Sequence, residues 1–239
     1  MSADPKFSSA LSTSATDFIE QVKVDAALAF EVFRETNTLT ANGTVSFTER
    51  VPGENKLAFI SYPGPWKRNK PLEADIIGLD GTVYQGQPRG DRWLKLFSQH
   101  PDITSISHFH TPYLAAHAQT HRTFRLTYVP PQRSALVREL PVYIDRRQTQ
   151  EDFILDQLRI NPNVPAILEA NGGSTAWGKE GLVKLAEFIL LLEEGAQVQH
   201  LATTLGGARE YGPGVLALQW KRRNWIGKAK ELGLLSAVD

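Results

Sequence analysis

Strand-like and helix-like segments alternate along this chain, and that alternation most constrains its fold. Apolar residues recur at helical spacing over 15–36, whereas Val45 and Phe47 alternate with polar residues as in a half-buried strand. No linker rich in Pro, Gly or Ser and no internal repeat separates the segments. We therefore expect one α/β domain over residues 15–239, preceded by a disordered tail rich in Ser, Ala and Thr over residues 1–14.

The remaining segments predict strands and helices in mixed order. Thr111 is a natural N-cap for a helix that starts at Pro112, and Thr149 and Asp152 can cap a helix that starts at Gln150. The expected strands cover 56–64, the two arms of a hairpin within 74–84, 103–109, 140–145 and 164–170, and the expected helices cover 92–99, 112–120, 150–160, 179–205 and 215–232.

Composition argues against several classes of partner and chemistry. Lys+Arg and Asp+Glu both number 26, so a neutral chain gives no reason to expect a nucleic-acid or membrane partner. The absence of cysteine excludes disulfides, thiolate nucleophiles and Cys-ligated zinc. The N-terminus lacks the pattern of a secretory signal, and the most apolar stretch, 182–192, is far shorter than the ~20 residues that span a bilayer. We expect a cytoplasmic protein.

Two histidines, His108 and His110, stand one residue apart at the end of an expected strand. Side chains at positions i and i+2 of a strand share one face, so two imidazoles there can share a divalent ion. Spacing alone is weak support, because a solvated strand face explains most such pairs. His117 and His121, four apart on an expected helix, have a spacing that can also bind metal, although surface or interface roles are commoner.

The segments around these histidines resemble the class II aldolase family, which includes ribulose-phosphate 4-epimerases and the adducin head. "HPDITSISHFHTPYLAAHA" is similar to the family segment that supplies two zinc ligands. "ANGTVSFTER", "FISYPG", "IIGLDGTVYQGQP", "PAILEANGGSTAWGK" and "LLLEEGAQ" resemble its other segments, in the same order, from about Asp25 to Leu205. The resemblance implies a three-layer α/β/α sandwich with a mainly antiparallel central sheet. It also implies a homotetramer with sites at the subunit interfaces.

The resemblance also implies the roles of individual residues. It gives catalytic roles to Asp91, His108, His110 and Tyr128, with Tyr211 as an alternative proton donor. His108 and His110 would hold a divalent ion, zinc first, with manganese or cobalt as alternatives. Substrate contacts are expected at Thr44, Gly64, Arg89, Asn171 and Gly172.

One departure from the family pattern concerns the metal. Gly172 stands where the family has its third zinc histidine, and glycine has no side chain to ligate with. Glu169 is the nearest carboxylate in sequence, but strand alternation argues weakly against it as a replacement. We therefore expect an ion that is absent or held weakly by His108 and His110 with water or substrate oxygens. Gly172→His is expected to tighten metal binding at least about tenfold.

A second departure concerns the phosphate pocket and the acid/base carboxylate. Arg89, Gly90 and Thr44 replace the family's phosphate-binding serines and asparagine, so we expect a substrate without phosphate. Arg89 can hold a substrate carboxylate through a bidentate pair, although a solvated arginine at a helix start is an equal alternative. Asp91 fits the acid/base position if the following helix is two residues shorter than in the family.

These features imply a lyase-type enzyme that acts through an enolate on a small oxygenated substrate. Aldol cleavage, decarboxylation, dehydration and epimerisation all fit that description. Two alternatives stay open. One is a non-catalytic, adducin-head-like binding or scaffold protein, which the missing third histidine favours. The other is a metal-free enzyme in which His108 or His110 serves as general base.

Overall fold

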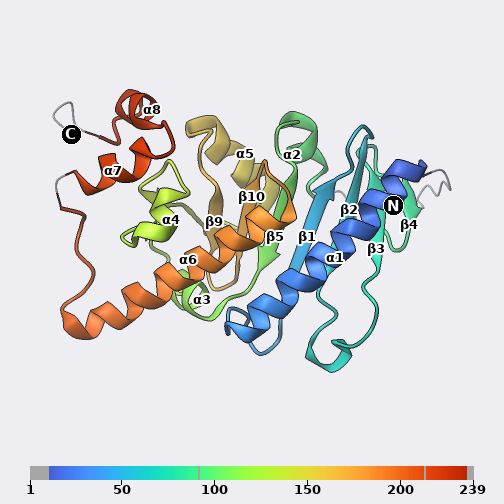
Figure 1. Ribbon diagram of the computed structural model, residues 1–239, viewed down its shortest axis with the longest axis horizontal. Helices are drawn as coiled ribbons and strands as arrows, with labels where there is room; N and C mark the ends of the chain where they lie inside the picture. Colours follow the sequence, from blue (N-terminus) through green and yellow to red (C-terminus); the bar gives the residue numbers. More distant parts are fainter. Residues whose placement is uncertain (1–10, 91, 213, 236–239) are drawn as a thin grey trace.

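The computed structural model describes residues 11–90, 92–212 and 214–235, and its centre is a single large sheet (Figure 1). Its strands are β1 (Val45–Arg50), β2 (Lys56–Ser61), β3 (Ala74–Gly78), β4 (Val83–Gln85), β5 (Ser105–Phe109), β8 (Val142–Tyr143), β9 (Ala166–Glu169) and β10 (Ser174–Gly178). They lie in the order β4-β3-β2-β1-β5-β10-β9-β8, and the β8–β9 pair alone is parallel among these described strands. β6 (Phe124–Arg125) and β7 (Glu139–Leu140) form a separate antiparallel pair.

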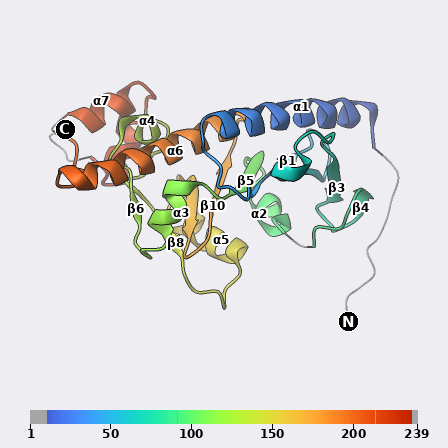
Figure 2. The ribbon, with the colours of Figure 1, turned by 90° about the horizontal axis from the view of Figure 1, so that it is seen from below.

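Helices cover both faces of the sheet (Figure 2). α1 (Thr13–Glu35) and α6 (Leu182–Ala202) lie on one face, and α2 (Leu94–Gln99) and α5 (Gln150–Ile160) lie on the other. The shorter helices are α3 (Pro112–Ala118), α4 (Val129–Arg133), α7 (Val215–Lys221), α8 (Ile226–Glu231) and the 3-10 turns η1 (Pro65–Lys67) and η2 (Thr203–Leu205). The predicted α/β fold, with a mainly antiparallel sheet between helices, is confirmed. Within the described residues, no helix is long and apolar enough to cross a membrane.

α1 is amphipathic, as its spacing predicts, and its apolar side meets the sheet. Phe30 and Phe33 bring their rings within 5.8 and 6.4 Å of the ring of Phe47 on β1. The helix begins two residues before the predicted start, because the Ser12 hydroxyl accepts the Ala15 N–H at 3.2 Å and caps it. Leu11 to Ser14, predicted as tail, therefore include a helix cap and a first turn. The rest of the predicted tail, residues 1–10, lies outside the described residues.

The C-terminal helix predicted over 215–232 is two helices. α7 and α8 are separated at Asn224, whose φ of 56° a continuing helix does not allow. The fold around them has its own small apolar cluster with the fully buried Trp220 at its centre, and the indole N–H donates to the Ala135 carbonyl at 3.2 Å. The break lets both short helices pack around one tryptophan.

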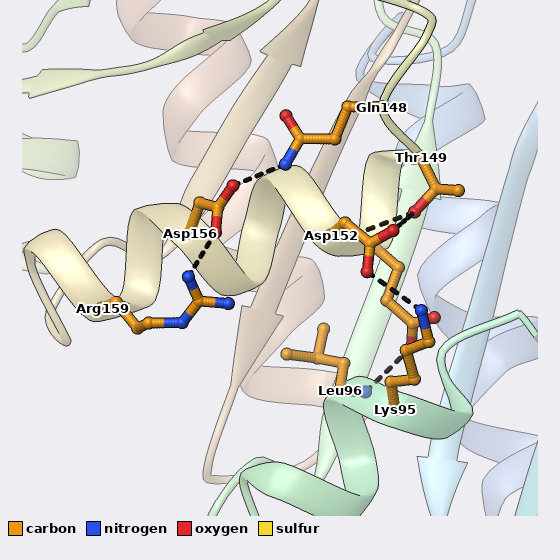
Figure 3. A network of polar contacts seen from close by, with 8 residues as sticks. Lys95, Leu96, Gln148, Thr149, Asp152, Asp156 and Arg159 are labelled. Carbon is orange, nitrogen blue, oxygen red and sulfur yellow. Dashed lines mark hydrogen bonds and ion pairs between the residues drawn. The ribbon is translucent and has the colours of Figure 1, made fainter.

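A polar network fixes the start of α5 against α2 (Figure 3). Glu151 accepts the backbone N–H of Leu96 at 2.8 Å, and Lys95 Nζ lies 3.0 Å from Asp152 Oδ1. Thr149 caps α5 as predicted, because its hydroxyl accepts the Asp152 N–H at 3.1 Å. The network fixes the N-terminus of α5, where Gln150 donates to Glu169 and Thr175.

Candidate functional site

His108 and His110 lie at the carboxyl end of β5, a strand in the middle of the sheet. His108 pairs with Ser46 of β1 on one side and with Thr175 of β10 on the other. His110 follows the strand, and its N–H donates to the Thr44 carbonyl at 2.8 Å. The two rings meet edge to face with their centroids 5.2 Å apart. Both imidazoles therefore leave the strand end on the same side.

A buried carboxylate holds His108 from the neighbouring hairpin. Glu169, at the end of β9 and only 6% exposed, places Oε1 2.9 Å from Nδ1 of His108. The Thr175 hydroxyl donates to the same oxygen at 3.0 Å and lies 3.1 Å from Nδ1. Gln150, the first residue of α5, donates through Nε2 to Glu169 and, at 2.6 Å, to Thr175. Sequence reasoning did not identify Thr175 or Gln150, since their part in the site depends on contacts between distant segments.

This network fixes which proton His108 carries. Burial raises the pKa of Glu169, but bonds from His108 and Thr175 and the charge of Arg146 outweigh it, so the pKa falls below its ordinary value. An ionised Glu169 only accepts hydrogen bonds, so Nδ1 of His108 donates a proton to it and Nε2 is the ring nitrogen that can exchange a proton with a substrate. Desolvation, then the neighbouring His108, lowers the pKa of His110, which is neutral at pH 7.

The turn between β9 and β10 brings Glu169 to the histidines. Glu169 N donates to the Gly173 carbonyl at 2.9 Å, Gly172 N donates to the Glu169 carbonyl at 2.8 Å, and Asn171 has a φ of 57°. The sequence predicts the break at Asn-Gly-Gly but not β10 as the returning strand. Strand alternation does not apply across this tight turn, and Glu169 reaches Nδ1 of His108. The expectation that Glu169 does not replace the third zinc ligand stays a prediction.

The two glycines of this turn differ in the space around them. A Cβ at Gly173 lies 2.4 Å from both His110 Cδ2 and the Phe109 carbonyl oxygen, whereas a Cβ at Gly172 meets nothing closer than 3.4 Å. We expect Gly173→Ala to lower the free energy of unfolding by about 1–3 kcal/mol through overpacking, and Gly172→Ala by less than about 1 kcal/mol. Urea unfolding of both variants checks this. Equal losses would show that both His110 and the Phe109 carbonyl move away from the added Cβ at little cost in free energy.

Arg146 and Arg92 make the surroundings of Glu169 positive, whereas Arg89 is paired elsewhere. Arg146 places Nη1 3.6 Å from Glu169 Oε2, and its Nη2 donates to the Ala170 carbonyl at 2.9 Å. Arg92 lies close enough to Glu169 and Arg89 for their charges to act on it. Arg89 itself is paired with Asp75 at 2.5 Å, through both Nε and Nη2. A substrate carboxylate at Arg89 would therefore compete with Asp75, while Arg146 is partnered only in part.

The other predicted site residues are distributed around the sheet. Thr44 lies beside His110, and Gly64 lies in the loop after β2 with a φ of 90°. Asn171 accepts from His121 Nε2 at 2.6 Å. Tyr128 lies at the start of α4 beside Gly195 of α6. Asp91 lies outside the described residues.

His117 and His121, the second pair that could bind metal, have surroundings different from those of His108 and His110. His117 and His121 do not share a helix as predicted, because α3 ends at Ala118 and His121 has a φ of 54°. His117 Nε2 instead lies 3.3 Å from the Thr123 carbonyl.

Burial raises the pKa of Tyr211 to about 12, and its ring lies under the guanidinium of Arg138. That pKa makes Tyr211 a poor source of protons at neutral pH.

The residues present do not complete the metal site that the resemblance implies. Within the described ranges, no group of three His, Cys, Asp or Glu side chains could hold an ion. Glu169 is bonded to the His108 nitrogen that faces away from a ligating Nε2. Beside Gly172, where the third histidine would stand, Arg146 Nη2 lies 3.5 Å from a built Cβ. Two imidazoles and a nearby guanidinium do not match the three-ligand sites of catalytic zinc.

A cavity of about 440 Å³ lies elsewhere, between the start of α6 and the C-terminal helices. Trp177, Phe188 and Trp225 line it together with charged residues such as Lys184. His108 and His110 are not among its lining residues.

Comparison with known proteins identifies a matching family and similar structures. The profile of the "Class II Aldolase and Adducin N-terminal domain" family matches residues 26–200. An L-fuculose 1-phosphate aldolase superposes with a TM-score of 0.68 at 18% identity, covering 85% of this chain and 96% of that one. The same enzyme from Glaciozyma antarctica PI12 gives 0.66 at 16% identity, covering 94% of each chain.

A third structural neighbour is less closely defined in function. YgbL from Escherichia coli, described as a putative aldolase/epimerase/decarboxylase, gives a TM-score of 0.65 at 18% identity, covering 87% of this chain and 99% of that one. No curated protein matches the sequence. The family profile covers most of the chain, so this protein belongs to the class II aldolase and adducin N-terminal domain family.

Proposed function

We propose that this protein is a lyase-type enzyme that forms an enolate from a small, unphosphorylated carboxylic acid, with His108 as the group that moves the proton. The family and fold support an aldolase-type lyase in general. The observation that carries the finer proposal is the bond between Nδ1 of His108 and the buried Glu169. A carboxylate that fixes one ring nitrogen leaves the other as an oriented base, which is the arrangement that proton transfer needs.

Charge supports an acidic substrate for the same site. Arg146 and Arg92 lie around Glu169, and Arg146 keeps N–H donors that have no acceptor among the described residues. A planar guanidinium with free parallel donors binds a carboxylate in bidentate fashion. Retro-aldol cleavage, decarboxylation, dehydration and epimerisation of such an acid all pass through an enolate or its equivalent, so the proposal does not select among them.

Some predicted features remain proposals of their own. Family membership supports a divalent ion in general, whereas the donor set around His108 and His110 does not complete its site. The steps proposed for His108 do not use an ion. We also propose, from the resemblance, that Asp91 is a second acid/base, that Tyr128 donates a proton and that the protein is a homotetramer. Light scattering after size-exclusion chromatography tests the tetramer.

Proton NMR in D₂O tests the proposed function. Unphosphorylated 2-oxo acids and 2- and 3-hydroxy acids are incubated with the protein, and cleavage, loss of CO₂ or water, and exchange of the hydrogen next to the carbonyl are followed. We expect turnover of at least one acid, reduced about 100-fold or more in His108→Asn. Asparagine keeps an N–H donor for Glu169 and lacks the basic Nε2, so the fold is retained while the base is lost.

His200→Asn is the matched control, because His200 is exposed late in α6. It is expected to keep the wild-type rate. A His108→Asn variant as active as His200→Asn would remove His108 from the mechanism. A wild-type protein that turns over no acid in the panel would favour the adducin-like binding protein instead.

A further inference from the structure

Arg146 lies beside Gly172, the position that the resemblance assigns to the family's third metal ligand. A Cβ built at Gly172 is 3.5 Å from Arg146 Nη2, so any side chain at that position grows out beside the guanidinium. Gly172 has no side chain, and the guanidinium reaches Glu169 and the Ala170 carbonyl through the space beside it. The Glu169 carboxylate lies between the His108 imidazole and the Arg146 guanidinium, with Oε1 toward His108 and Oε2 toward Arg146.

The guanidinium is held in place from several sides. It lies over the ring of Tyr143, 4.5 Å from the ring centroid. The loop that carries it is tightened by the bond from Gln148 N to the Asp145 carbonyl at 3.3 Å and by the bond from the Tyr143 hydroxyl to the Gln148 carbonyl. The Thr149 cap and the network around α5 then fix the end of this loop (Figure 3). Its position is therefore built by the fold, although the side chain is 51% exposed.

We propose that Arg146 takes the place of the third metal ligand and supplies the fixed positive charge of the site, where it binds the carboxylate of the substrate. The inference deepens the proposed function, since it names the group that recognises the acid. The guanidinium carries five N–H donors, of which the described residues engage the one at Ala170 and face another toward Glu169. The remaining donors are open to a ligand, and their planar arrangement fits two carboxylate oxygens.

The same guanidinium disfavours a tightly bound dication. A fixed positive charge near Glu169 repels a second cation at the histidines, and the site offers no third protein ligand among the described residues. Gly172→His alone restores a ligand but leaves the charge beside it. The tightening expected from that substitution on sequence grounds should therefore appear in full only when Arg146 is also removed.

Calorimetric titration with zinc tests the replacement without any reference to turnover. Wild type and Gly172→His are expected to bind zinc with dissociation constants within about tenfold of each other, and Gly172→His/Arg146→Ala at least about 100-fold more tightly than wild type. Cobalt absorption bands of a four-coordinate site should appear in the double variant alone. Tight zinc binding by wild type, or full tightening in Gly172→His by itself, overturns the proposal.

Titration with pyruvate in the presence of a chelator tests the carboxylate. We expect saturable binding by wild type that weakens at least about tenfold in Arg146→Ala and only partly recovers in Arg146→Lys. Arg147→Ala is the matched control, because Arg147 is the next residue, 92% exposed and paired with Asp145; its affinity should equal that of wild type. Absence of pyruvate binding, or binding that ignores Arg146, overturns the proposal.

The two proposals fail separately. If pyruvate binding depends on Arg146 but no acid is turned over, Arg146 binds carboxylates as inferred and the proposed lyase activity is wrong. If turnover depends on His108 but not on Arg146, the proposed lyase activity is supported and the inference about Arg146 is wrong.

Discussion

Replacing Glu49 by glutamine is expected to raise the free energy of unfolding by about 5 kcal/mol at pH 9 and by almost nothing at pH 4. Glu49 lies on β1, is 3% exposed, and its Oε1 has no hydrogen-bond partner among the described residues. Burial raises its pKa from 4.5 to about 8, although contacts with Ser105 and the Leu182 backbone N–H oppose the rise. The difference of about 3.5 pH units corresponds to roughly 5 kcal/mol at ~1.36 kcal/mol per unit.

The direction of the effect follows from proton binding. Unfolded Glu49 loses its proton near pH 4.5, whereas the folded protein keeps it until about pH 8. Between these values the folded state binds more protons, so wild-type stability falls as the pH rises through this window. Glutamine keeps the neutral shape of the protonated acid and has no proton to lose. The variant therefore escapes that loss.

Urea unfolding of wild type and Glu49→Gln at a series of pH values between 4 and 9 measures the difference. Glu31→Gln, an exposed position on α1, is the matched control and should follow the wild-type curve. A Glu49→Gln curve parallel to wild type across the whole range would show that Glu49 ionises in the folded protein as it does in the unfolded chain.

Sequence patterns could predict the sheet and its major helices because those elements bury one periodic face. α1 shows this most clearly, since the apolar spacing that predicts it also gives its buried side. β10 was not predicted because "STAWG" lacks both strict alternation and a run of branched residues. The break of the last helix at Asn224 follows from packing around Trp220. That packing joins residues from different segments, so no local sequence pattern predicts it.

The candidate site could be predicted only where one strand carries its residues. His108 and His110 are neighbours in sequence and in space, so spacing identifies both. Gln150, Thr175 and Arg146 come from three other segments and meet at Glu169 only after folding. A sequence signal for the loop existed in the two arginines before the Thr149 cap, "IDRRQTQ", but nothing local distinguishes Arg146 from the exposed Arg147.

Glu193→Ala is expected to lower the free energy of unfolding by about 3–5 kcal/mol. Glu193 is buried in α6, and its two oxygens accept the backbone N–H groups of Tyr113 at 2.7 Å and Leu114 at 2.9 Å. These donors belong to the first turn of α3, where a helix has no partners of its own. Thr111 stands at the N-cap as predicted, but its hydroxyl makes no capping bond, so Glu193 supplies the cap from another helix.

Glu194→Ala separates this effect from loss of a charge on α6, because Glu194 is the next residue and is exposed. It should cost less than about 1 kcal/mol. The Tyr113 and Leu114 amides should exchange with solvent faster in Glu193→Ala and at the wild-type rate in Glu194→Ala, which hydrogen exchange by NMR measures. α3 begins two residues after His110, so a loosened first turn also frees the strand end that carries the histidines. If the two variants lose equal stability, Glu193 is not what fixes the start of α3, and the order of the histidine pair must come from β5 and its neighbours alone.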